Sequence, residues 1–89
     1  MKVSITNQRQ LNDFEDSGRG WIVNQREDRI QVHCSGCESV GAMTQKYPKT
    51  WFSDKSEARV WLDSEFGRGN WTNCGFCGGI GLEMEASRD

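Results

Sequence analysis

Two cysteine pairs with the spacing Cys-x-x-Cys constrain this chain more than any other feature. Cys34 and Cys37 form the first pair, Cys74 and Cys77 form the second, and the 89-residue chain has no other cysteines. Each tight turn of this kind offers two sulfur ligands, so two turns complete the tetrahedral shell of a structural zinc ion. We therefore predict one structural zinc ion per chain, bound by all four cysteines. Disulfide bonds are the alternative that the pattern leaves open.

The length of the chain favours a single domain, residues 1–89, with a modest core. A bound metal ion is a common aid to the stability of such small domains, and we expect the metal-free chain to be partly or wholly unfolded. No run of about 18 apolar residues is present, and no apolar stretch follows the charged start. These features predict a cytoplasmic protein without a membrane segment, where paired cysteines bind metal rather than form disulfides.

The hydrophobic pattern predicts two short helices and several strands. One helix is expected over 6–17, ended by Gly18, and a second over 53–66, whose apolar stripe comprises Ala58, Trp61, Leu62 and Phe66. Strands are expected over 21–24 and 29–33, near 41–45 and after the second cysteine pair, while Pro48 indicates a turn or an edge strand. The predicted fold is α+β: a small zinc-stapled domain with knuckle β-hairpins at 34–41 and 74–81 and a helix-bearing insertion over 42–73.

His33 immediately precedes the first cysteine pair and is the only histidine. It could replace a cysteine as a metal ligand, but four thiolates already complete a tetrahedral shell. Successive side chains of a strand point to opposite faces, so His33 is expected to point away from the side on which Cys34 lies. We therefore predict a strand histidine without a role in the metal site.

The second knuckle, Cys74 and Cys77 followed by Gly79 and Gly81, resembles the Cys-x-x-Cys-x-Gly-x-Gly repeat of the DnaJ (Hsp40) chaperones. The first knuckle matches at both cysteines and at Gly41 but has a serine where the first glycine is expected. Paired repeats of this kind also resemble those of small bacterial and phage transcription regulators. The resemblance implies zinc binding and a hairpin-rich knuckle, and it implies no chaperone function because the chain lacks the His-Pro-Asp signature of a J-domain.

Composition and motifs favour a binding protein over an enzyme. A four-cysteine shell leaves no open position for catalysis, and the chain has no nucleotide-binding fingerprint. A formal net charge of −2 and four tryptophans favour a small regulator or adaptor that binds another protein. The alternative is a nucleic-acid-binding regulator, because lysines alternate with aromatic residues in one segment. Its surface would comprise Lys46, Tyr47, Lys49, Trp51, Lys55 and Arg59, and this alternative requires an exposed Trp51.

Overall fold

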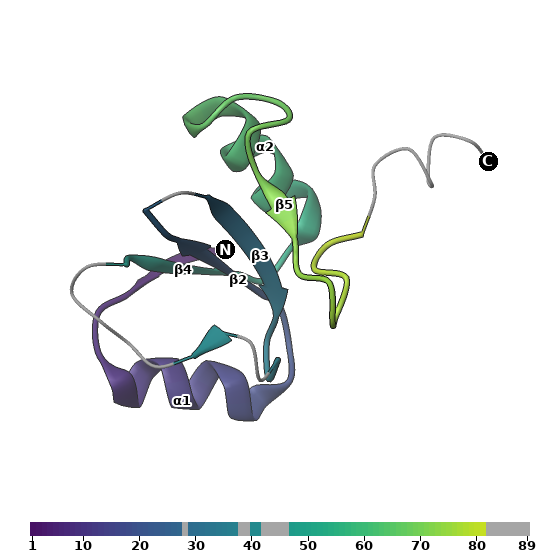
Figure 1. Cartoon of the computed structure of the whole chain (residues 1–89). Coiled ribbons are helices and arrows are strands. Elements are labelled where there is room, and N and C mark those ends of the chain that lie inside the picture. The colour runs from purple at the N-terminus through teal and green to yellow at the C-terminus, as the bar shows by residue number, and fades with distance from the viewer. Residues whose placement is uncertain (28, 38–39, 42–46, 82–89) are drawn as a thin grey trace.

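The computed structural model describes residues 1–27, 29–37, 40–41 and 47–81 and shows an α+β fold (Figure 1). Five strands form one sheet in the order β1-β4-β2-β3-β5, and two helices pack against it. All neighbouring strands are antiparallel except β3 and β5, which are parallel. The elements in chain order are β1 (Lys2–Ile5), α1 (Gln8–Ser17), β2 (Trp21–Gln25), β3 (Ile30–Cys34), β4 (Lys49–Phe52), α2 (Lys55–Glu65) and β5 (Thr72–Asn73).

The two helices cover opposite faces of the sheet (Figure 1). Leu11 of α1 is buried with Ile22 and Trp51 in one core cluster. Ala58 and Leu62 of α2 are buried in the other cluster, which comprises Val23, Val32, Phe52, Ala58, Leu62 and Ile80. Alternation along β2 sends Ile22 and Val23 to opposite faces, so neighbouring residues of one strand build both cores.

Both predicted helices are present, and their ends follow from local chemistry. Asn7 caps α1 because its side-chain oxygen accepts a hydrogen bond from the Gln10 backbone N–H at 2.8 Å. Gly18 ends the helix in the left-handed conformation, with a φ of 66°. Asp54 caps α2 by accepting a hydrogen bond from the Ser56 backbone N–H at 2.9 Å.

Replacing the α1 cap tests whether that local contact contributes to stability. Asn7→Ala is expected to lower the free energy of unfolding by about 1 kcal/mol, because one amide of the first turn loses its partner. The midpoint of thermal unfolding should then fall by about 4–8 °C. Asn12→Ala on the same helix removes only an exposed side-chain pair with Gln8 and should change the midpoint by a much smaller amount. Equal shifts in the two variants would contradict the capping role.

Of the two alternatives expected at Pro48, a turn or an edge strand, the edge strand is wrong. β4 lies inside the sheet between β1 and β2, and Pro48 itself lies just before it. Pro48 immediately precedes the first paired residue, where its missing N–H removes no hydrogen bond between strands, and its carbonyl accepts a hydrogen bond from the Gln25 N–H at 3.0 Å. The segment over 47–73 therefore supplies an interior strand as well as α2. The strands expected near 41–45 and after the second cysteine pair, from Ile80 onward, fall largely outside the described residues.

Candidate metal site

The parallel pairing of β3 with β5 brings the two cysteine pairs together. Val32 of β3 lies opposite Asn73 of β5, and the next residue, Cys74, donates its backbone N–H to the Val32 carbonyl at 2.8 Å. The second cysteine pair therefore begins beside the end of β3, which is also where the first pair begins. A short strand interaction between distant parts of the chain thus positions both pairs.

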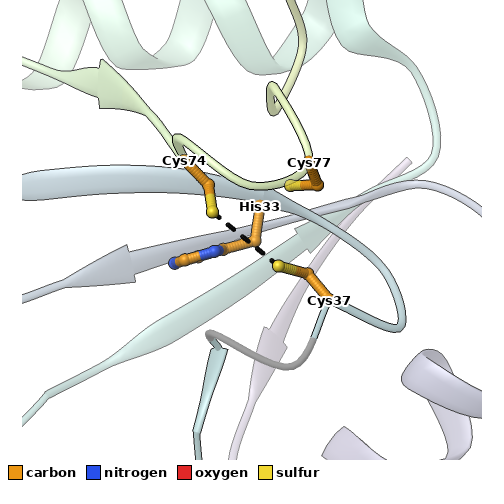
Figure 2. Close-up of side chains that lie close together, drawn as sticks. All are labelled: His33, Cys37, Cys74 and Cys77. Carbon is orange, nitrogen blue, oxygen red and sulfur yellow. Dashed lines mark hydrogen bonds between the residues drawn. The ribbon is translucent and has the colours of Figure 1, made fainter.

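Four side chains form a group that can hold a metal ion: His33, Cys37, Cys74 and Cys77. Their ligand atoms all lie within 4.8 Å of one another. Figure 2 shows the sulfur atoms converging from the turn after β3 and from the loop after β5, with the imidazole of His33 beside them. The expected convergence of the two cysteine pairs is confirmed, and it forms a group that could hold a metal ion.

The spacing of the sulfur atoms suits metal coordination and excludes a disulfide. The Sγ atoms of Cys37 and Cys74 are 3.7 Å apart, and none of the four cysteines is in a disulfide. A disulfide would require about 2.05 Å. Two sulfurs at about 2.3 Å from a tetrahedral zinc ion would be about 3.8 Å apart, which is close to the observed separation. The donor set therefore fits an ion of this kind.

Cys34 lies against the cluster but outside the four-atom group. Its backbone N–H donates to the Sγ of Cys77 at 3.1 Å. Its own sulfur lies 3.4 Å from the Gly79 carbonyl oxygen and 3.7 Å from the Cys77 carbonyl oxygen, as an S–H donor would. Of the four cysteines predicted as ligands, three thus belong to the group and the fourth contacts it.

Backbone amides converge on the sulfurs of the second knuckle. The Phe76 N–H donates to the Sγ of Cys74 at 3.3 Å, and the Gly79 N–H donates to the Sγ of Cys77 at 3.4 Å. Such bonds stabilise a thiolate and orient it toward a metal. Burial raises the pKa of Cys74, but hydrogen bonds from the backbone of Cys77 and Phe76 outweigh it and lower the pKa to about 7.

The surroundings of Cys34 act in the opposite direction. Burial raises the pKa of its thiol, and a hydrogen bond with Cys77 together with the nearby sulfurs raises it further, to about 11. The four cysteines are therefore not equivalent in the metal-free chain. Cys74 is more readily converted than Cys34 to the thiolate that binds a metal ion.

His33 is fully buried, and neither of its ring nitrogens has a hydrogen-bond partner among the described residues. Burial lowers the pKa of the imidazole, and the positive charges of Lys49 and Arg26 lower it further, so the neutral form that binds metals is favoured. From the sequence, His33 was the less favoured ligand, because four cysteines already complete a tetrahedral shell. The signal that could have identified it is its position next to the first cysteine pair.

The segment proposed as a nucleic-acid surface is not a continuous exposed patch. Trp51 is 9 % exposed and stacks on Phe14 with ring centroids 4.4 Å apart, and its indole N–H donates to the Arg19 carbonyl. Lys49 is 3 % exposed, and its ammonium group donates to Asn24 Oδ1 at 3.2 Å. Of the other members, Tyr47 and Arg59 are half-buried, Lys55 is exposed, and Lys46 lies outside the described residues.

No protein-family model, curated protein or solved structure matches this chain. Within the described residues, no helix has the length and apolar character needed to span a membrane. Function is therefore inferred from the chemistry of the metal site and from the side chains that surround it.

Proposed function

We propose that this chain is a small zinc-binding regulatory or adaptor protein that acts by binding another protein. Zinc is the ion that suits sulfur and imidazole donors in a tetrahedral arrangement, and its role here is structural. The likeness of the second knuckle to the DnaJ-type repeat supports zinc, although it carries over no chaperone activity. Four donors fill the shell of the ion, so the proposal includes no catalytic step at the metal.

One observation carries the protein-binding part of the proposal: Phe76 is 90 % exposed. The residue lies in the turn between Cys74 and Cys77, and its backbone N–H is fixed to the Cys74 sulfur. A metal ion bound by these cysteines would hold the phenyl ring at a defined place on the surface. Exposed aromatic side chains on rigid supports are frequent anchors of protein interfaces, because their burial by a partner removes a large apolar area from water.

The nucleic-acid alternative receives less support. It depended on an exposed Trp51 flanked by cations, and Trp51 is part of the core on the α1 side of the sheet. Lys49 is buried on the same strand, so its ammonium group is directed to Asn24 rather than to a phosphate in solvent. A protein partner that contacts Phe76 is therefore the better proposal.

Replacing Phe76 is expected to weaken partner binding strongly without disturbing the fold. Phe76→Ser should retain one zinc ion and an unchanged thermal midpoint, because the side chain makes few contacts, yet weaken binding at least about 30-fold, as loss of an interface anchor does. The zinc-loaded chain would be used to capture a partner from cell extract. The captured protein would then be purified and its affinity for each variant measured by calorimetry.

Val60→Ser is the matched control for this experiment. Val60 is 70 % exposed on α2, remote in sequence from the metal site, so the same change in polarity there should leave the affinity unaltered. Equal binding of wild type and Phe76→Ser by the purified partner would refute the role of Phe76. A zinc content below one per chain in wild type would refute the metal part of the proposal independently.

A further inference from the structure

His33 and Cys34 are adjacent in β3, and their side chains leave the strand on opposite faces. His33 pairs with Ile22 of β2, and Ile22 belongs to the core cluster under α1. Cys37 also packs against that cluster. Cys34 is the next residue along the pleat and therefore points to the other face, where Val32 packs under α2. The strand thus offers an imidazole on one side and a thiol on the other.

The register with β5 places Cys74 on the same face as His33. Gln31 pairs with Thr72 and Val32 pairs with Asn73, so the same parallel register continued by one residue sets His33 beside Cys74. Side chains at equivalent positions of neighbouring strands share a face. Figure 2 shows the result, with the imidazole next to the sulfurs of Cys74 and Cys37.

The buried imidazole of His33 has no hydrogen-bond partner among the described residues, which indicates that it binds a ligand. A buried polar group that lacks a hydrogen-bond partner destabilises the folded chain, because it has lost its contacts with water. Neither ring nitrogen has a partner within the part of the chain that the structure describes, although the side chain is fully buried. A metal ion among the neighbouring sulfurs would satisfy one nitrogen and remove that cost.

The contacts of the Cys34 sulfur differ from those of the Cys74 and Cys77 sulfurs. Its Sγ faces the carbonyl oxygens of Cys77 and Gly79, which are acceptors for an S–H group. The sulfurs of Cys74 and Cys77, in contrast, accept hydrogen bonds from backbone N–H groups. A metal-bound sulfur carries negative charge, so carbonyl oxygens are unfavourable neighbours for it and amides are favourable ones.

We infer that the metal ion is bound by His33, Cys37, Cys74 and Cys77, and that Cys34 is not a ligand. This assignment rests on the proposed metal binding and identifies which side chains perform it. It also changes the charge of the site. Three thiolates and a neutral imidazole around a divalent ion give a net charge of −1, whereas four thiolates would give −2. The sulfur of Cys34 instead lies against the carbonyl oxygens of Cys77 and Gly79 in the second knuckle.

X-ray absorption and NMR spectroscopy of the zinc-loaded wild-type chain test the assignment directly. The absorption spectrum should fit three sulfur neighbours and one nitrogen neighbour. Because the chain has a single histidine, a long-range ¹H–¹⁵N correlation spectrum gives one imidazole pattern, and one nitrogen should shift when zinc is added. Four sulfur neighbours with an unchanged imidazole pattern would overturn the assignment but leave metal binding intact. Failure to bind zinc would overturn both proposals.

Two matched cysteine variants provide a second measurement. Cys34→Ser retains a hydroxyl donor for the carbonyl oxygens of Cys77 and Gly79 and should change zinc affinity by less than about tenfold. Loss of a hydrogen bond to a metal ligand usually weakens metal binding by about 10–100-fold. Cys37→Ser removes a ligand and should weaken zinc binding at least about 100-fold, beyond that range. With cobalt in place of zinc, the sulfur-to-metal charge-transfer absorption should stay constant in Cys34→Ser and fall by about a third in Cys37→Ser. Equal losses in both variants would contradict the assignment.

Discussion

Removal of the metal ion is expected to lower the midpoint of thermal unfolding by more than about 20 °C, or to abolish the cooperative transition. The metal site joins the end of β3 to the loop after β5, and that loop supplies Ile80 to the core cluster that contains Val32 and Phe52. Structural zinc contributes about 10–16 kcal/mol of apparent binding free energy, whereas a small domain has about 5–15 kcal/mol of total stability. A loss of only about 4 kcal/mol would already produce a shift of this size.

The measurement is circular dichroism during heating, made under reducing conditions before and after chelation. Returning zinc should restore the original midpoint, which would separate loss of metal from irreversible damage. Cys74→Ser should show the low midpoint even in the presence of zinc. A midpoint within a few degrees of the loaded chain, with metal analysis showing complete removal, would mean that the two core clusters suffice without the ion.

Local sequence chemistry predicted the helices well. The end of α1 at Gly18 and the apolar stripe of α2 depend on residues within one or two turns, so a single sequence contains the necessary information. The two cysteine pairs were equally easy to recognise in the sequence, because each Cys-x-x-Cys spacing belongs to a local turn. These features required no knowledge of how distant segments pair.

Long-range pairing accounts for what the sequence analysis missed. The placement of His33 beside Cys74 depends on the parallel register between β3 and the two-residue strand β5, and proximity to Cys34 in the sequence does not give that register. β1 was missed because Val3 and Ile5 alternate over too short a run to be distinctive. In β4, Lys49 is buried although its charge suggested solvent exposure, because Asn24 on the neighbouring strand accepts its hydrogen bond.

The loop after the second cysteine pair provides the other large expected effect, at Gly79. This residue has a φ of 54°, and a Cβ atom there would lie 2.7 Å from the Val32 carbonyl oxygen and even closer to Asn73 Oδ1. Asn73 holds the loop by accepting a hydrogen bond from the Ile80 N–H at 3.1 Å and donating to the Gly81 carbonyl at 2.8 Å. An added methyl group would separate the loop from both β3 and Asn73.

Gly79→Ala is therefore expected to lower the free energy of unfolding of the zinc-loaded chain by about 3 kcal/mol or more, through overpacking added to backbone strain. Gly78→Ala is the matched control, since Gly78 also has a positive φ, of 81°, but nothing within 4 Å of the added Cβ. Strain alone should cost this control about 1–2 kcal/mol. Zinc affinity should also fall more in Gly79→Ala than in Gly78→Ala. Displacement of Gly79 removes the N–H that its backbone donates to the Cys77 sulfur. Urea unfolding and zinc competition with a chromophoric chelator measure the two quantities. Similar losses in the two variants would show that the close approach of the loop to Val32 contributes nothing to the assembled site.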